Sequence, residues 1–144
     1  MANKITVVSL EKQFKKFGKD VRGDALAIFK ILNKNNVAID IYLASNVLMR
    51  RLNKEYRGKD KVANVLSFVE PLNFPHPETK TRFLGEIYLN FIDSDKFVIS
   101  CQYLLIHAIL HLLGYTHKGK SDRMKMEKKE NHVYHLFRHR NFAN

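Results

Sequence analysis

Four short segments carry the pattern of β-strands. Residues 5–10 (ITVVSL), 65–70 (VLSFVE) and 84–90 (LGEIYLN) are short and apolar, and residues 38–44 (AIDIYLA) alternate apolar and polar side chains. Such runs, rich in β-branched and aromatic residues, favour strands over helices. The chain is therefore expected to form a four-stranded sheet.

Four other segments have apolar residues at helical spacing. They cover residues 24–34, 46–57, 97–113 and about 121–138. The first is expected to begin after Gly23, and Ser45 or Asn46 can cap the second. The third, FVISCQYLLIHAILHLL, is apolar on nearly every side, so it should lie buried at the centre and end at Gly114.

The segment 71–82, PLNFPHPETKTR, contains all three prolines of the chain, and we expect an exposed loop there because proline cannot donate to a sheet ladder. Strands and helices otherwise alternate along 144 residues, a length that suits a single core. We expect one domain over residues 1–144, of the α+β or α/β class.

Charge and composition narrow the partners and the compartment. The formal charge is +11, which favours a polyanionic partner, with nucleic acid first and an anionic membrane surface second. A single cysteine, Cys101, cannot form an internal disulfide, and this fits a reducing compartment. The sequence shows neither an apolar run long enough to span a membrane nor a leader pattern at its start, so we expect a cytoplasmic protein.

Three histidines in HAILHLLGYTH (107–117) are the main chemical signal. His107 and His111 are four residues apart, so they emerge on one helix face about one turn apart. A turn at Gly114 lets His117 approach the same point. Three imidazoles can bind one zinc ion and leave a fourth position open for water, which is typical of a catalytic site. In a zinc peptidase a glutamate follows the first histidine; here that residue is Ala108, which disfavours a peptidase.

The last expected helix has one apolar face, formed by Met126, Glu130, Val133 and Phe137 at steps of four, three and four residues. Glu130 should therefore point inward, toward a ligand histidine. On the other side of the helix lies a stripe of His132, His135 and His139, which we interpret as solvated rather than as a second metal site.

The segment HAILHLLGYTH closely resembles the HGxLHLxGYDH signature of the YbeY family, bacterial endoribonucleases that mature ribosomal RNA. Residues 52–68 (LNKEYRGKDKVANVLSF) are similar to another family motif, LGEIYLN resembles its LGDI-type strand, and Met126 and Glu130 match its Met-x-x-x-Glu. The resemblance implies an α+β fold with a mixed four-stranded sheet and four to five helices. It also implies one Zn²⁺ per chain on His107, His111 and His117.

The resemblance further implies a single-strand-specific endoribonuclease that acts in small-subunit ribosomal RNA maturation and ribosome quality control. It points to ribosomal RNA precursors, the small ribosomal subunit and its proteins as partners, with the GTPase Era as a candidate. The family arginine corresponds to Arg57, whose planar guanidinium can hold two phosphate oxygens. Glu86, on a strand expected to lie near the histidine helix, is the best acidic candidate for a catalytic base. A carboxylate that braces a histidine or a neighbouring backbone group is at least as strong an interpretation.

The chain departs from the family pattern at several positions: Ala63, Asn64, Glu86, Ala108 and Thr116. The missing carboxylates at 64 and 116 leave a second function open, in which the protein is an RNA- or ribosome-binding assembly factor with a structural metal. The metal ligands themselves match.

Overall fold

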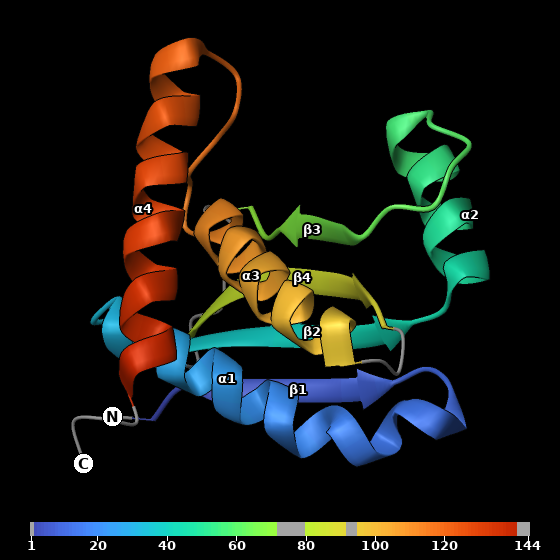
Figure 1. Cartoon of the computed structure of the whole chain (residues 1–144), viewed down its shortest axis with the longest axis horizontal. Helices are drawn as coiled ribbons and strands as arrows, with labels where there is room; N and C mark the ends of the chain where they lie inside the picture. The colour runs from blue at the N-terminus through green and yellow to red at the C-terminus, as the bar shows by residue number, and fades with distance from the viewer. Residues whose placement is uncertain (1, 72–79, 92–94, 141–144) are drawn as a thin grey trace.

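The structure, a computed structural model, describes residues 2–71, 80–91 and 95–140, with the side chains of 95–100 left aside. Its elements are β1 (Lys4–Ser9), a 3-10 helix η1 (Lys12–Phe17), α1 (Gly18–Ile31), β2 (Val37–Ala44), α2 (Asn46–Arg57), β3 (Val65–Val69), β4 (Arg82–Asn90), α3 (Asp95–Leu112) and α4 (Lys120–His139). Figure 1 shows α1, α3 and α4 gathered on one side of a single sheet and α2 set apart at one end.

The sheet is mixed and has the strand order β1-β2-β4-β3. Strands β1, β2 and β4 are parallel, whereas β3 runs antiparallel to β4 and forms one edge. The expected α+β domain with a mixed four-stranded sheet is thus confirmed, and all four expected strands are present.

Alternation along the strands decides which side chains form the core. Ile39, Ile41 and Leu43 of β2 are fully buried in the main cluster with the helices α1, α3 and α4. Each such side chain contributes about 1.5–3 kcal/mol to folding when it leaves water. Asp40 and Tyr42, between them, face the other side of the sheet, because successive residues of a strand point to opposite faces.

Helix α2 covers part of that other face through a second, smaller cluster. Met49 is fully buried there against Leu66 of β3, with Phe68 and Tyr88 packed around them. Val47 does not contribute to this apolar face of α2, because it is 79% exposed. Ser45 occupies the N-cap position, but its side chain makes no capping hydrogen bond.

Helix α1 begins at Gly18, six residues before the expected start at Asp24, and follows a 3-10 helix that was not expected. The segment KQFKKFGKDVRG is too polar and glycine-rich to predict a helix. Tertiary packing orders it instead: the ring of Phe14 lies 5.5 Å from that of Phe91, and the ring of Phe17 lies 4.8 Å from it.

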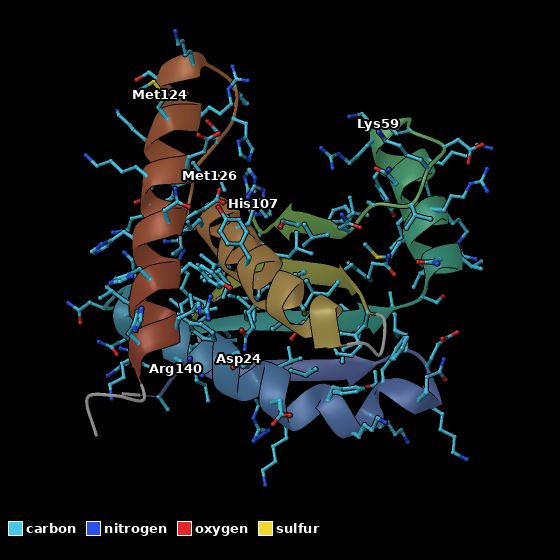
Figure 2. The ribbon with its side chains drawn as sticks, in the orientation of Figure 1. Asp24, Lys59, His107, Met124, Met126 and Arg140 are labelled. Carbon is cyan, nitrogen blue, oxygen red and sulfur yellow. The ribbon has the colours of Figure 1, made fainter. Side chains whose placement is uncertain are left out.

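The C-terminal helix closes the core as expected, with Met126, Val133 and Phe137 buried. At its end Arg140 reaches Asp24 of α1, with Nη2 3.5 Å from Oδ1 (Figure 2). Most of the expected 71–82 loop, residues 72–79, lies outside the described residues; Pro71 is exposed and Arg82 already belongs to β4. Among the helices that the structure describes, none has the length and apolarity to cross a membrane.

Candidate metal centre

Helix α3 presents two histidines because its other sides are occupied by the core. Leu105, Ile106, Ala108 and Ile109 are buried, whereas His107 and His111 are only partly buried, one turn apart. The helix ends at Leu112, and Gly114 takes a positive φ of 106°, as expected for a turn after the helix. The chain then folds back and brings His117 to the same point.

The three imidazoles converge through their Nε2 atoms. The Nε2 of His107 lies 3.1 Å from that of His111 and 3.3 Å from that of His117. Ligands at 2.0–2.1 Å around a tetrahedral zinc ion are separated by about 3.3 Å, so this spacing fits such an ion. His107, His111 and His117 could hold one metal ion, and no further cluster of this kind occurs in the part of the chain that is described.

The other ring nitrogen of two histidines is held by an acceptor. His107 Nδ1 lies 2.9 Å from Glu130 Oε1, and His111 Nδ1 lies 3.0 Å from the carbonyl oxygen of Tyr115. A carboxylate and a carbonyl oxygen can only accept, so each Nδ1 donates and its Nε2 keeps a free lone pair for a metal. The expectation that Glu130 points inward is confirmed, and its carboxylate meets His107 of the trio.

Burial shifts the pKa values of the groups around this centre. Glu130 is only 3% exposed. Burial, together with the nearby carboxylate of Glu130, raises the pKa of Tyr103 to about 12, and the Tyr103 hydroxyl donates to Asn131 Oδ1 at 3.4 Å. Burial and the neighbouring His107 and His117 lower the pKa of His111, which favours the neutral imidazole that a metal requires.

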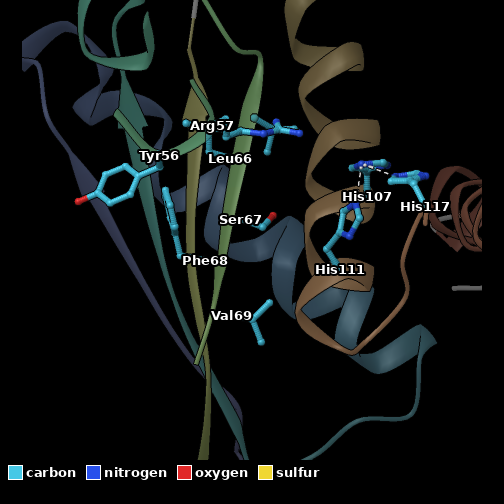
Figure 3. A pocket seen from close by; sticks show the side chains of 10 residues that line it. Tyr56, Arg57, Leu66, Ser67, Phe68, Val69, His107, His111 and His117 are labelled. Atoms are coloured by element: carbon cyan, nitrogen blue, oxygen red, sulfur yellow. Dashed lines mark hydrogen bonds between the residues drawn. The ribbon is translucent and has the colours of Figure 1, made fainter. Parts of the chain in front are cut away.

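A groove of about 600 Å³ separates the histidines from β3 and the end of α2. Arg57, the last residue of α2, extends across β3 toward the histidine side of this groove (Figure 3). The buried Asn53 holds the following loop in place, since its Nδ2 donates to the carbonyl oxygen of Lys61 at 2.9 Å. The structure therefore brings Arg57 and the histidine trio to one groove.

The groove also has a wall that sequence reasoning did not identify. Val65, Ser67 and Val69 of β3 line it, and the Ser67 hydroxyl lies on the histidine side of the strand (Figure 3). Alternation within VLSFV contains this signal, because Leu66 and Phe68 pack toward α2 and their neighbours must face the other way.

Glu86 is not brought to the histidines. It pairs in register with Asp40, on the face of the sheet opposite that of Ile87, which is buried in the core beneath the helices. There it is a hydrogen-bond partner of Tyr42, and this bond, after burial itself, raises the pKa of Tyr42 to about 12. Strand β4 is adjacent to α3, but the side chain of Glu86 faces the opposite side of the sheet, so the structure does not place this candidate base at the histidines.

The remaining candidates occupy simpler environments. Ala108 is fully buried and Cys101 is buried, so neither faces the groove. Thr116 donates to Asp122 at 3.4 Å. The stripe formed by His132, His135 and His139 is exposed, as expected.

An α+β domain whose histidine trio can hold a metal ion beside an open groove is built as metal-dependent hydrolases are. Comparison with known proteins identifies the family: residues 1–138 match the family described as Endoribonuclease YbeY. The chain belongs to this family.

Individual relatives agree. The protein named Endoribonuclease YbeY from Sulfurihydrogenibium sp. is 38% identical over 78% of this chain and 75% of its own length. The proteins of that name from Finegoldia magna and Neorickettsia sennetsu are 34% and 32% identical, over 73% and 71% of this chain and 72% and 74% of their own lengths. A solution structure of a Thermotoga maritima protein matches the fold with a TM-score of 0.50 and 22% identity, over 97% of this chain and 95% of that one.

Proposed function

We propose that this chain is a zinc-dependent endoribonuclease that cuts single-stranded RNA during maturation of small-subunit ribosomal RNA in the cytoplasm. Membership of the Endoribonuclease YbeY family supports RNA cleavage. The observation that carries the proposal is one groove with the Nε2 atoms of three histidines on one wall and Arg57 on the other.

His107, His111 and His117 would hold the zinc ion. When bound, zinc supplies a Lewis acid and lowers the pKa of its water to about 7. Glu130 keeps the Nδ1 proton of His107, and the carbonyl of Tyr115 keeps that of His111, so both rings stay oriented with Nε2 toward the ion.

Arg57 would bind the phosphate. Its guanidinium can donate to two phosphate oxygens and neutralise the charge that develops on them as the phosphodiester is attacked. The hydroxyl of Ser67 faces the same space and can donate one more hydrogen bond. We assign no proton transfer to Glu86, because it lies on the far face of the sheet.

The surrounding charge suits a polyanion. Exposed basic residues of α2 and the following loop lie on the Arg57 side of the groove: Arg50, Arg51, Lys54, Lys59 and Lys61. Arg50 is bonded to Asp60 at 2.8 Å, which leaves the others to attract the RNA backbone.

The alternative, an assembly factor with a structural metal, is less well supported. Structural zinc sites use four protein ligands. Among the described residues three side chains form the cluster, and it faces the groove.

The test is cleavage of single-stranded and double-stranded RNA by zinc-loaded protein, beside its zinc content. We expect about one zinc per chain and preferential cleavage of the single strand. Chelation or His111→Ala should abolish both zinc binding and cleavage. Arg57→Ala should lower cleavage by about 10²-fold or more without loss of zinc. Arg22→Ala, an exposed arginine of α1 that does not line the groove, is the control.

RNA that binds without being cut would favour the assembly factor. The ribosomal role has its own test: cells that lack the protein should accumulate longer small-subunit RNA precursors, and the wild-type gene but not His111→Ala should remove them. Co-sedimentation with the small ribosomal subunit, and with Era added, tests the proposed partners.

A further inference from the structure

Tyr56 is an aromatic residue whose exposure the fold does not require. It is 61% exposed, and it is the one exposed aromatic side chain in the described part of the chain. Its ring contacts Phe68 edge-on, with centroids 5.2 Å apart and planes at 71°. Phe68 in turn meets Tyr88 at 5.7 Å, so the ring beneath Tyr56 is itself braced by the sheet.

The position of Tyr56 connects it to the metal centre. Tyr56 and Phe68 line the same groove as Arg57 and the three histidines. Figure 3 shows Tyr56 and Phe68 on one side of β3 and the histidines on the other, with Arg57 extending across between them. Because β3 is the edge of the sheet, the groove passes around a strand that has no neighbour on that side.

A single strand crossing this edge would present a phosphate and a base to different residues. A phosphate held by Arg57 near the histidines places the adjoining nucleotide beside Tyr56, the residue next to it in the chain. An exposed aromatic ring is the usual stacking partner of an unpaired base.

The charges around Tyr56 limit where a nucleotide could lie on this face of the sheet. Next to Tyr56 lie Arg57 and the exposed Lys59, both cationic. Farther along the same face of the sheet stand Glu86 and Asp40, whose carboxylates repel a phosphate backbone. The favourable region is therefore confined to Tyr56 and its support, Phe68.

We propose that Tyr56, backed by Phe68, is a stacking subsite for the base next to the phosphate held by Arg57. The proposal rests on the proposed function, since its ligand is single-stranded RNA. Every base has a π-face, so this subsite favours unpaired bases over paired ones without selecting a sequence.

The absence of tryptophan from the chain permits a direct test. Tyr56→Trp introduces a single tryptophan at the subsite, and Val47→Trp places one on the same helix at a position 79% exposed and outside the groove lining. Both zinc-loaded proteins are titrated with a single-stranded oligoribonucleotide carrying 2′-O-methyl groups, checked on a gel to remain intact. The second probe is an abasic oligonucleotide of the same length, which keeps the sugar-phosphate backbone but has no bases.

We expect the base-bearing strand, but not the abasic one, to quench the Tyr56→Trp emission, while Val47→Trp emission stays unchanged. In the chain without an introduced tryptophan, the substitution Tyr56→Ala should weaken binding of the base-bearing strand by about five- to a hundredfold. Tyr56→Leu, which keeps an apolar contact with Phe68, should weaken it similarly, and Tyr56→Phe should bind within about twofold of the original.

Equal quenching by the abasic strand, or unchanged affinity in Tyr56→Ala and Tyr56→Leu, would overturn the stacking subsite. These results are separable from the proposed nuclease. If the Tyr56→Trp protein is quenched by the base-bearing strand but no RNA is cut, only the proposed nuclease is contradicted. If RNA is cut but Tyr56→Ala binds the base-bearing strand as tightly as the original protein, only the stacking subsite is contradicted.

Discussion

Glu130→Gln should weaken zinc binding without weakening the metal-free fold. Glu130 Oε1 lies 2.9 Å from His107 Nδ1, and its carboxylate is only 3% exposed. A glutamine oxygen can still accept that proton, so the ring keeps its orientation and only the negative charge is lost. Partners that orient a metal-bound histidine are worth about 10–100-fold in metal affinity. This corresponds to about 1.4–2.7 kcal/mol.

The metal-free protein should respond differently. A buried carboxylate beside a neutral imidazole is destabilised by desolvation, so its neutral amide should leave the melting temperature in chelator unchanged or raised. The hydroxyl of Tyr103, which lies beside Glu130 and donates to Asn131, can accept a hydrogen bond from the glutamine amide. The expected signature is a smaller zinc-induced rise in melting temperature from a baseline that has not fallen.

Zinc affinity is measured by competition with a chromophoric chelator, and thermal unfolding is followed with and without metal. Glu127→Gln, an exposed acidic residue one turn earlier on α4, is the control and should change neither quantity. Unchanged zinc affinity in Glu130→Gln would refute the reasoning. An equal loss of stability with and without zinc would show instead that Glu130 serves the fold rather than the metal.

Three further outcomes are expected. Gly85→Ala should destabilise the protein by more than about 3 kcal/mol in chemical denaturation, because Gly85 has a φ of +143° and an added Cβ would collide with the carbonyl oxygen of Phe68. The control is Gly23→Ala in α1, where the added Cβ meets open space, and it should stabilise the protein by about 0.5–1 kcal/mol. The pKa of His111 is lowered from 6.5, so its stabilising contribution is complete above that pH and is lost as the pH falls through the lowered value. The melting temperature of the metal-free protein should therefore fall as the pH is lowered from 7 toward 5, and that of His111→Gln should fall less over the same interval. Burial raises the pKa of Cys101 to about 12, so a thiol reagent at pH 8 should modify the unfolded but not the native protein.

The histidine trio could be predicted because its geometry is almost entirely local. Four residues of helix set His107 beside His111, and one glycine turn returns His117 to them. The inward position of Glu130 followed equally from the periodicity of α4. The approach of Arg57 to the groove depends on how α2 packs across the sheet, and only the family resemblance pointed to it.

The two main differences between the expected and the observed structure arise from tertiary packing, which the pattern of apolar and polar residues does not reveal. Phe91 orders the polar segment around Phe14 and Phe17, which has no helical periodicity of its own. In β4 the register shifts near Gly85, so Leu84 and Ile87 both reach the core although they are three residues apart. This irregularity interrupts the alternation that would otherwise have shown Glu86 to face away from the histidines.

The hydrogen bond between His107 and Glu130 connects the metal centre to α4. During synthesis, the three histidines leave the ribosome before the carboxylate that orients the first of them. A growing chain therefore carries its potential ligands for some time without the helix that fixes their geometry. The metal centre is therefore expected to reach its full affinity only after α4 has packed against α3 and Glu130 has fixed the ring of His107.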